Sequence, residues 1–203
     1  MVRRHGKGTY VAEQHTADSP VRLTDFMQDM ALAGLVPSSR VLRLARERAN
    51  RILAEALQVA PETEVVRVDR LRLANERPIA IDTTWLPLRY GVLLTDTDLA
   101  EQPIYRLLEN IYGVVIASNT FHISAVSATA EQANLLDIAV GAAVLLIQRL
   151  STTLHGEPVY MQERYYLPER VCYRATLQRP DPAIPGGLVL QDLRPVFRDY
   201  PNR

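Results

Sequence analysis

Two long runs of strand-forming residues constrain the fold more than any other feature. The runs are "EVVRVDRLRLANERPIAIDTTWLP" (64–87) and "AAVLLIQRLSTTLHGEPVYMQERYYLP" (142–168), and each is interrupted once by a short polar segment. Runs of this kind around a turn predict β-hairpins. Further strands are expected over 8–12, 40–46 and 114–129. Hairpins pair antiparallel, so the sequence predicts an antiparallel sheet with at least one face covered.

Helical spacing of apolar residues appears in four other segments, 24–34, 48–59, 103–113 and 130–138. Thr24 is suited to cap the first of these helices, while Gly34, Pro61 and Gly113 are suited to end three of them. Helices and hairpins together predict an α+β domain, with an antiparallel sheet and flanking helices, over about residues 24–175.

The two ends of the chain differ from this body. Residues 13–23 are polar, contain a proline and indicate a linker after the short N-terminal segment 1–12. The segment 176–203 holds five of the thirteen prolines and predicts an extended or disordered C-terminal tail.

Composition excludes several classes of function. The formal net charge is zero, so any contact with nucleic acid would need a local basic patch. The single cysteine, Cys172, cannot form an intrachain disulfide, and this favours a reducing, cytoplasmic location. No apolar stretch reaches the length of a membrane helix. The four histidines lack metal-site spacing, and no phosphate-binding glycine loop or nucleophile elbow occurs, so we expect neither a metal nor a cofactor.

Arg70 and Arg72 are the most informative charged residues. They lie two positions apart in a predicted strand, so their side chains point to the same face, which Val66 and Val68 continue. Burying two guanidinium groups without an anion is costly, and the planar guanidinium suits a carboxylate or phosphate. A solvated sheet face with cross-strand ion pairs is the alternative.

The position of Asp82 depends on the turn of the first hairpin. A three-residue loop at 75–77 would place Asp82 opposite Arg70, whereas a two-residue loop would place Ile81 there.

Two other strands carry candidate ligand contacts. Tyr160, Gln162, Arg164 and Tyr166 share one face of a predicted strand, and this face suits either a small-ligand pocket or a wet sheet surface. The segment "SNTFHIS" offers Ser118 and His122 in mid-strand, where a histidine can be structural or can contact a ligand.

The opening "RRHGKGTYV" resembles the wing of the winged helix-turn-helix in GntR-family transcription regulators. The body of the chain resembles the effector domain of the HutC-type branch, the UTRA domain, through "LTDFMQDMALAGLVPSSRVL", "RVDRLRLANERPIAIDTTWLP", "IYRLLENIYGV", "SATAEQANLLDIAVGAAVLLIQR" and "GEPVYMQERYYLPERVCY". The resemblance covers about residues 4–175. It implies a chorismate-lyase-like fold, a homodimer and a small anionic metabolite bound as effector, such as a sugar phosphate, a carboxylate or a phosphonate.

The resemblance also implies roles for individual residues. The effector-binding positions it suggests, with the strand candidates above, are Thr24, Asp25, Phe26, Arg70, Arg72, Asp82, Ser118, His122, Tyr160 and Tyr166. Amino-sugar-phosphate sensors tend to carry Glu at the positions of Asp82 and Tyr160. The tyrosine at 160 removes a carboxylate partner for an ammonium group and therefore weakens the case for an amino sugar.

The wing contributes Arg3, Arg4, Gly6, Lys7 and Gly8 as candidate DNA contacts. The three DNA-binding helices that the family places before the wing are absent from this sequence. We therefore expect the sensor half of a regulator, which would recognise operator DNA only together with the rest of the protein. The alternative is an enzyme on a chorismate-lyase-like fold, but no acid–base pair stands out in the sequence.

Overall fold

The computed structural model describes residues 26–94, 99–100, 102–179 and 188–198, together with the backbone of residues 2–3 and 9–10. The chain forms two compact units. The larger contains Asp25–Cys172 and Val196–Arg203, and the smaller contains Met1–Thr24 and Tyr173–Pro195. Thr24 and Asp25, two of the predicted binding residues, lie outside the described residues, as do Arg4, Gly6, Lys7 and Gly8.

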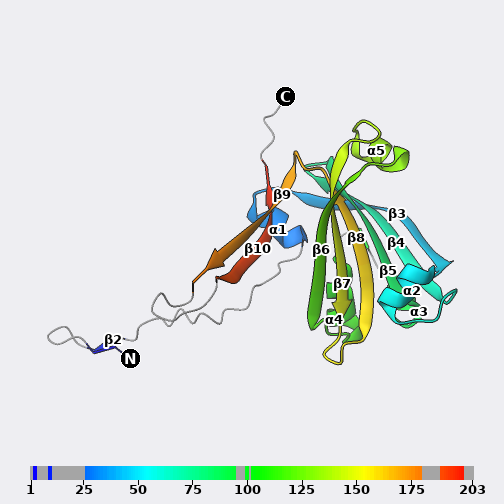
Figure 1. Cartoon of the computed structure of the whole chain (residues 1–203), viewed down its shortest axis with the longest axis horizontal. Coiled ribbons are helices and arrows are strands. Elements are labelled where there is room, and N and C mark those ends of the chain that lie inside the picture. Colours follow the sequence, from blue (N-terminus) through cyan, green and yellow to red (C-terminus); the bar gives the residue numbers. More distant parts are fainter. Residues whose placement is uncertain are drawn as a thin grey trace. The chain divides into compact units, whose positions relative to one another are not determined.

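A six-stranded antiparallel sheet forms the centre of the larger unit (Figure 1). Its spatial order is β3-β4-β5-β8-β7-β6. The strands are β3 (Pro37–Arg48), β4 (Glu64–Ala74), β5 (Arg77–Pro87), β6 (Ser118–Ser127), β7 (Ala143–Thr152) and β8 (Pro158–Tyr166). Both predicted hairpins are present, β4 with β5 and β7 with β8, and the contact between β5 and β8 joins them.

Helices cover both faces of this sheet. The front face, defined here as the one carrying Arg70 and Arg72, packs against α4 (Ile104–Tyr112), α3 (Leu88–Gly91) and the short 3₁₀ helix η1 (Val92–Leu94). The back face packs against α2 (Arg51–Leu57) and α5 (Ala130–Leu136). The first helix, α1 (Phe26–Leu32), places Phe26 against the front face through Tyr166 of β8.

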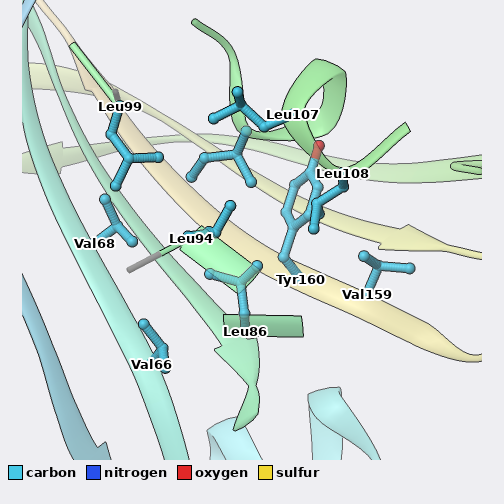
Figure 2. Close-up of a cluster of buried hydrophobic side chains, with 10 residues drawn as sticks. Val66, Val68, Leu86, Leu94, Leu99, Leu107, Leu108, Val159 and Tyr160 are labelled. Atoms are coloured by element: carbon cyan, nitrogen blue, oxygen red, sulfur yellow. The ribbon is translucent and has the colours of Figure 1, made fainter. Parts of the chain in front are cut away.

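The front-face core explains how α4 is held. Figure 2 shows Leu107 and Leu108 of α4 directed toward Val68, Leu86 and Tyr160 of the sheet, all of them almost fully buried. The helix ends where the sequence predicts, because Gly113 adopts a left-handed backbone with φ of 68° and its N–H donates to carbonyls of the last turn. The apolar stripe of α4 thus packs on the sheet face that carries Arg70 and Arg72, and this packing holds the helix beside them.

The turn between β4 and β5 differs from the three-residue loop that would place Asp82 opposite Arg70 in a regular hairpin. Asn75 and Glu76 form a two-residue turn, and both have positive φ, as hairpin turns of this length favour. Ile81 would then face Arg70 if pairing were regular. Ile79 is instead an extra residue between the pairs Leu73–Pro78 and Arg72–Ala80, and this β-bulge restores Asp82 opposite Arg70. The predicted neighbours meet, but for a different reason.

Two short strand pairings lie wholly or mostly in the smaller unit. Strand β1 (Val2–Arg3) pairs with β2 (Thr9–Tyr10), and β9 (Val171–Gln178) pairs with β10 (Val189–Phe197). Strand β10 lies within the segment predicted as an extended or disordered tail. The prolines of that segment led to this prediction, but its residues 189–197 form a strand that pairs with β9. None of the helices in the described part of the chain has the length and apolar character needed to span a membrane.

Gly91 offers a test of the front-face packing. A Cβ atom added there would overlap the side chain of Val66 in β4. We expect Gly91→Ala to lower the free energy of unfolding by about 1–3 kcal/mol, because the overlap forces the buried helix and strand apart. Urea denaturation measures the change. Arg89→Ala in the same short helix is the control, since that side chain is 56% exposed and should change stability little. Equal stability of the Gly91→Ala and wild-type chains would contradict this packing.

Candidate functional site

Five charged side chains from four adjacent strands gather on the front face. Arg70 and Arg72 come from β4, Asp82 from β5, Arg164 from β8 and Arg149 from β7. We call this group the arginine cluster. The register explains the gathering, since Arg70 lies opposite Asp82 and Asp82 lies opposite Arg164. Alternation of side chains then directs all five toward the same face.

Asp82 is the centre of the arginine cluster and is fully buried. Its Oδ2 accepts from Arg72 Nε at 2.6 Å and from Arg164 Nη2 at 2.9 Å, and its Oδ1 accepts from Arg164 Nε. Arg70 Nη2 lies 3.5 Å from the same Oδ2. One carboxylate therefore holds three guanidinium groups.

These contacts determine the protonation states. Burial alone would raise the pKa of Asp82, but the positive charges of Arg164 and Arg72 outweigh it and hold that pKa far below its usual range. Burial and repulsion by Arg72 lower the pKa of Arg70, which is nearly fully buried. Asp82 is therefore an anion that neutralises only part of the surrounding charge.

Two guanidinium nitrogens in the arginine cluster lack partners. Arg70 donates from Nη1 to the carbonyls of Leu99 and Gln102, at 3.3 and 3.4 Å, but its buried Nε makes no hydrogen bond. The buried Nε of Arg149 is likewise unpaired. Within the described residues these are the two buried side-chain polar atoms without a partner, and unpaired buried donors are rare in native proteins.

Gln162 of β8 connects the arginine residues. Its Oε1 accepts from Arg149 Nη2 at 2.8 Å and from Arg164 Nη2 at 3.3 Å, while its Nε2 donates to Thr84 Oγ1 at 2.8 Å. The amide orientation is thereby fixed, with the carbonyl toward the two guanidinium groups. Arg149 also lies over the ring of Tyr160, 5.1 Å from its centroid.

Helix α1 covers the arginine cluster through Phe26. The guanidinium carbons of Arg164 and Arg72 lie 4.7 and 5.3 Å from the centre of this ring. Tyr166 and Phe197 contact the ring from the side, with centroids 6.2 and 6.1 Å away. The remaining cavity is about 30 Å³ and is lined by Phe26, Met27, Arg70, Arg72, Pro103, Ile104, Tyr105, Arg149, Gln162 and Arg164. It has room for about one water molecule.

The structure brings together six of the residues that the sequence suggested, Phe26, Arg70, Arg72, Asp82, Tyr160 and Tyr166. It does not bring Ser118 and His122 to them. His122 pairs with Gln148 in β7, and Ser118 pairs with Thr152, so both lie on the back face. Both are exposed.

Arg149 was missed by the sequence analysis, and Arg164 and Gln162 were left out of the effector-binding positions although their strand face was considered. Arg164 and Gln162 shared a predicted face with the two tyrosines, so the strand pattern contained a signal for them. Arg149 had no such signal, because its proximity depends on how β7 pairs with β8. Among the residues that the structure describes, no three His, Cys, Asp or Glu side chains meet as a metal site requires.

Comparison with known proteins identifies the family. The UTRA domain model matches residues 32–171, which is more than half of the chain. The chain belongs to the UTRA domain family.

Its relatives are transcriptional regulators. The HTH-type transcriptional repressor NagR of Bacillus subtilis is 29% identical over 171 residues, covering 81% of this chain and 70% of NagR. The mannosyl-D-glycerate transport/metabolism system repressor MngR of Escherichia coli is 30% identical over 133 residues, covering 66% of this chain and 55% of MngR.

Solved structures agree with this assignment. The ligand-binding domain assigned to a GntR-family transcriptional regulator from Bordetella bronchiseptica is 32% identical, with a TM-score of 0.65. The alignment covers 70% of this chain and 92% of that one. The effector domain of PhnF from Mycobacterium smegmatis, at 19% identity and a TM-score of 0.68, shares the fold. The alignment with that domain covers 74% of this chain and 93% of that one. The predicted α+β fold and family are confirmed.

The central carboxylate can be tested by neutralising it. Asp82→Asn leaves three buried guanidinium groups uncompensated, so we expect a loss of about 3–5 kcal/mol in the free energy of unfolding at neutral pH. Because the pKa of Asp82 is lowered on folding, this difference should be present above the unfolded pKa of about 3.9 and should shrink as the pH falls below it.

Anions give a second measurement on the same variant. Sulfate should stabilise Asp82→Asn more than it stabilises the wild type, since it can replace the lost charge, in urea titrations at matched ionic strength. Asp69→Asn is the control, because Asp69 binds Arg67 on the back face and its loss creates no comparable anion site. Equal gains from sulfate in all three chains would contradict the assigned role of Asp82.

Proposed function

We propose that this chain is the effector-sensing part of a transcriptional regulator, and that a small anionic metabolite binds at the arginine cluster. Binding then changes the affinity of the whole regulator for operator DNA. One observation carries this proposal. Four guanidinium groups and one carboxylate leave a net charge of +3 beside a covered cavity, and the described residues of its lining contain no further carboxylate.

The chemistry of the cluster favours an anion over a neutral ligand. A buried cation is costly unless it is paired, and Asp82 compensates only one of the positive charges. Guanidinium groups bind carboxylates and phosphates through paired, charge-assisted hydrogen bonds. The names of two relatives refer to mannosyl-D-glycerate and fructoselysine, which supports a sugar-derived metabolite as the effector of this chain.

Helix α1 provides a route from the effector to the rest of the regulator. The cavity holds about 30 Å³, so a metabolite can enter only if part of the lining moves, and Phe26 and Met27 are the residues that α1 contributes to it. Phe26 begins α1, and the chain immediately before it leads through the predicted linker 13–23 to the wing-like segment 1–12. Displacement of Phe26 would therefore act directly on the connection to a DNA-binding domain. Coupling of this kind is reciprocal, so operator DNA should change effector affinity by the same factor.

The alternative, an enzyme on this fold, has less support. A general base needs a pKa near the working pH, whereas the pKa of Asp82 is held far below that range. The relatives found are transcriptional regulators, which favours a sensor.

Arg72→Ala tests the anion site. Arg72 donates to Asp82 and to Ser39 Oγ, at 2.6 and 2.5 Å, and lies beneath Phe26. A charge-assisted contact contributes roughly 1.5–3 kcal/mol, so we expect about 10- to 150-fold weaker binding of inorganic phosphate in calorimetry. Arg40→Ala, an exposed arginine on β3, is the control. Wild-type affinity in the Arg72→Ala chain would argue against binding at the cluster.

The natural effector can be sought directly. Native mass spectrometry of gently purified protein, compared with the denatured chain, should show a bound mass that is lost on denaturation. We expect this mass to be absent from protein that carries Arg72→Ala, since that variant weakens the same site.

We also propose that two copies associate through β6. This strand is one of the two edges of the six-stranded sheet, and Ile123 on it is 45% exposed. An uncovered edge favours pairing with another strand.

Sedimentation should give a mass near twice 22.8 kDa, and Ile123→Lys should shift it toward the monomer. Ile52→Lys, at a side chain that is 75% exposed on α2, should leave the dimer intact. A monomeric wild-type chain at ~50 μM would exclude a micromolar dimer.

A further inference from the structure

Arg149 differs from the other three arginine residues in its surroundings. Arg70, Arg72 and Arg164 all contact Asp82, whereas Arg149 contacts Gln162 Oε1 and the face of Tyr160. Within the described part of the chain it has no carboxylate partner. The arginine cluster therefore has two parts, a group of three guanidinium groups around Asp82 and a separate fourth one.

The two unpaired nitrogens follow the same division. Arg70 Nε belongs to the group around Asp82, and Arg149 Nε belongs to the separate guanidinium, yet both residues line the same cavity. Arg149 comes from β7 and Arg70 from β4, with β5 and β8 between them. Three strand spacings correspond to about 14 Å between the two strand backbones, and both side chains line the cavity. The two residues that carry an unpaired buried donor therefore line one cavity from two separate strands.

The charges divide in the same way. Three guanidinium groups and one carboxylate leave +2 around Asp82, while Arg149 adds +1 at its own position. A phosphate dianion would balance the first part and a carboxylate the second. Helix α4 adds the positive end of its dipole on the cavity side, since Pro103 and Ile104 at its beginning line the cavity and no side chain caps it.

We propose that the effector carries two anionic groups on one small molecule, as in a phosphorylated carboxylic acid, and that Arg149 selects for the second group. This inference rests on the proposed function, because it describes the ligand of the same site. Tyr160 contributes by holding Arg149 over its ring. The arrangement disfavours an amino sugar phosphate, whose ammonium group would meet a guanidinium.

Two probes of nearly equal size test the proposal. Glycerol 3-phosphate has one anionic group, and 3-phosphoglycerate adds a carboxylate at the other end. At a pH near 8, where a phosphate monoester is a dianion because its second pKa is about 6, calorimetry should show 3-phosphoglycerate binding the wild-type chain roughly tenfold more tightly or better.

Variants of Arg149 locate the origin of that preference. Arg149→Gln should reduce the ratio of the two affinities to about one, because it weakens binding of 3-phosphoglycerate far more than binding of glycerol 3-phosphate, while Arg149→Lys should retain part of the preference. Arg89→Gln, an exposed arginine outside the cavity, is the matched control and should keep the full ratio. Thermal unfolding establishes that each variant is folded, and Arg149→Lys serves if the glutamine variant is not.

The outcomes distinguish a failure of the role assigned to Arg149 from a failure of the proposed anion site. Equal binding of both probes to the wild type, or an unchanged preference in Arg149→Gln, would overturn the role of Arg149 and leave the proposed anion site standing. Binding of neither probe would overturn the proposed site and this inference with it.

Discussion

The ion pairs of Asp82 are the interaction on which the front face depends. A fully buried carboxylate accepts from Arg72 and Arg164 and lies 3.5 Å from Arg70, so it links three strands through side chains as well as through the sheet. Buried ion pairs seldom stabilise a protein more than apolar packing would. One carboxylate among four guanidinium groups is therefore consistent with the proposed anion site, and a contribution to stability alone would not explain it.

The sequence predicted much of the fold, because hairpin patterns, apolar spacing and stop residues such as Gly113 are local signals. It predicted that Arg70 and Arg72 share a face, because side chains alternate along a strand. It could not predict the bulge at Ile79, which decides whether Asp82 or Ile81 faces Arg70.

Arg149 was missed for a related reason, since its place depends on pairing between strands rather than on its own strand. The alternation of side chains along β6 puts His122 on the face opposite the arginine cluster. The sequence alone could not show which face of this strand would meet the cluster.

At the proposed anion site, Phe26 offers the guanidinium groups an electron-rich partner. Its ring lies within 5.3 Å of the guanidinium carbons of Arg72 and Arg164, and the electron-rich face of an aromatic ring attracts cations. Such contacts contribute less than a charge-assisted hydrogen bond, so an anion bound as proposed would displace the ring. The contact of Phe197 with the same ring means that the end of β10 also resists this displacement. Covering and binding therefore compete for the same guanidinium groups.

This competition sets the sensitivity of the proposed switch. The free energy gained by the anion is reduced by the cost of moving Phe26, so tighter packing of the ring lowers the apparent affinity for the effector. The same packing increases the difference between the covered and open states, which is what a DNA-binding domain connected to α1 could detect. An effector that bound both states equally would shift nothing. In the proposed switch, the guanidinium groups would contact the ring in the covered state and the anion in the bound state, so the position of Phe26 would report which partner they have.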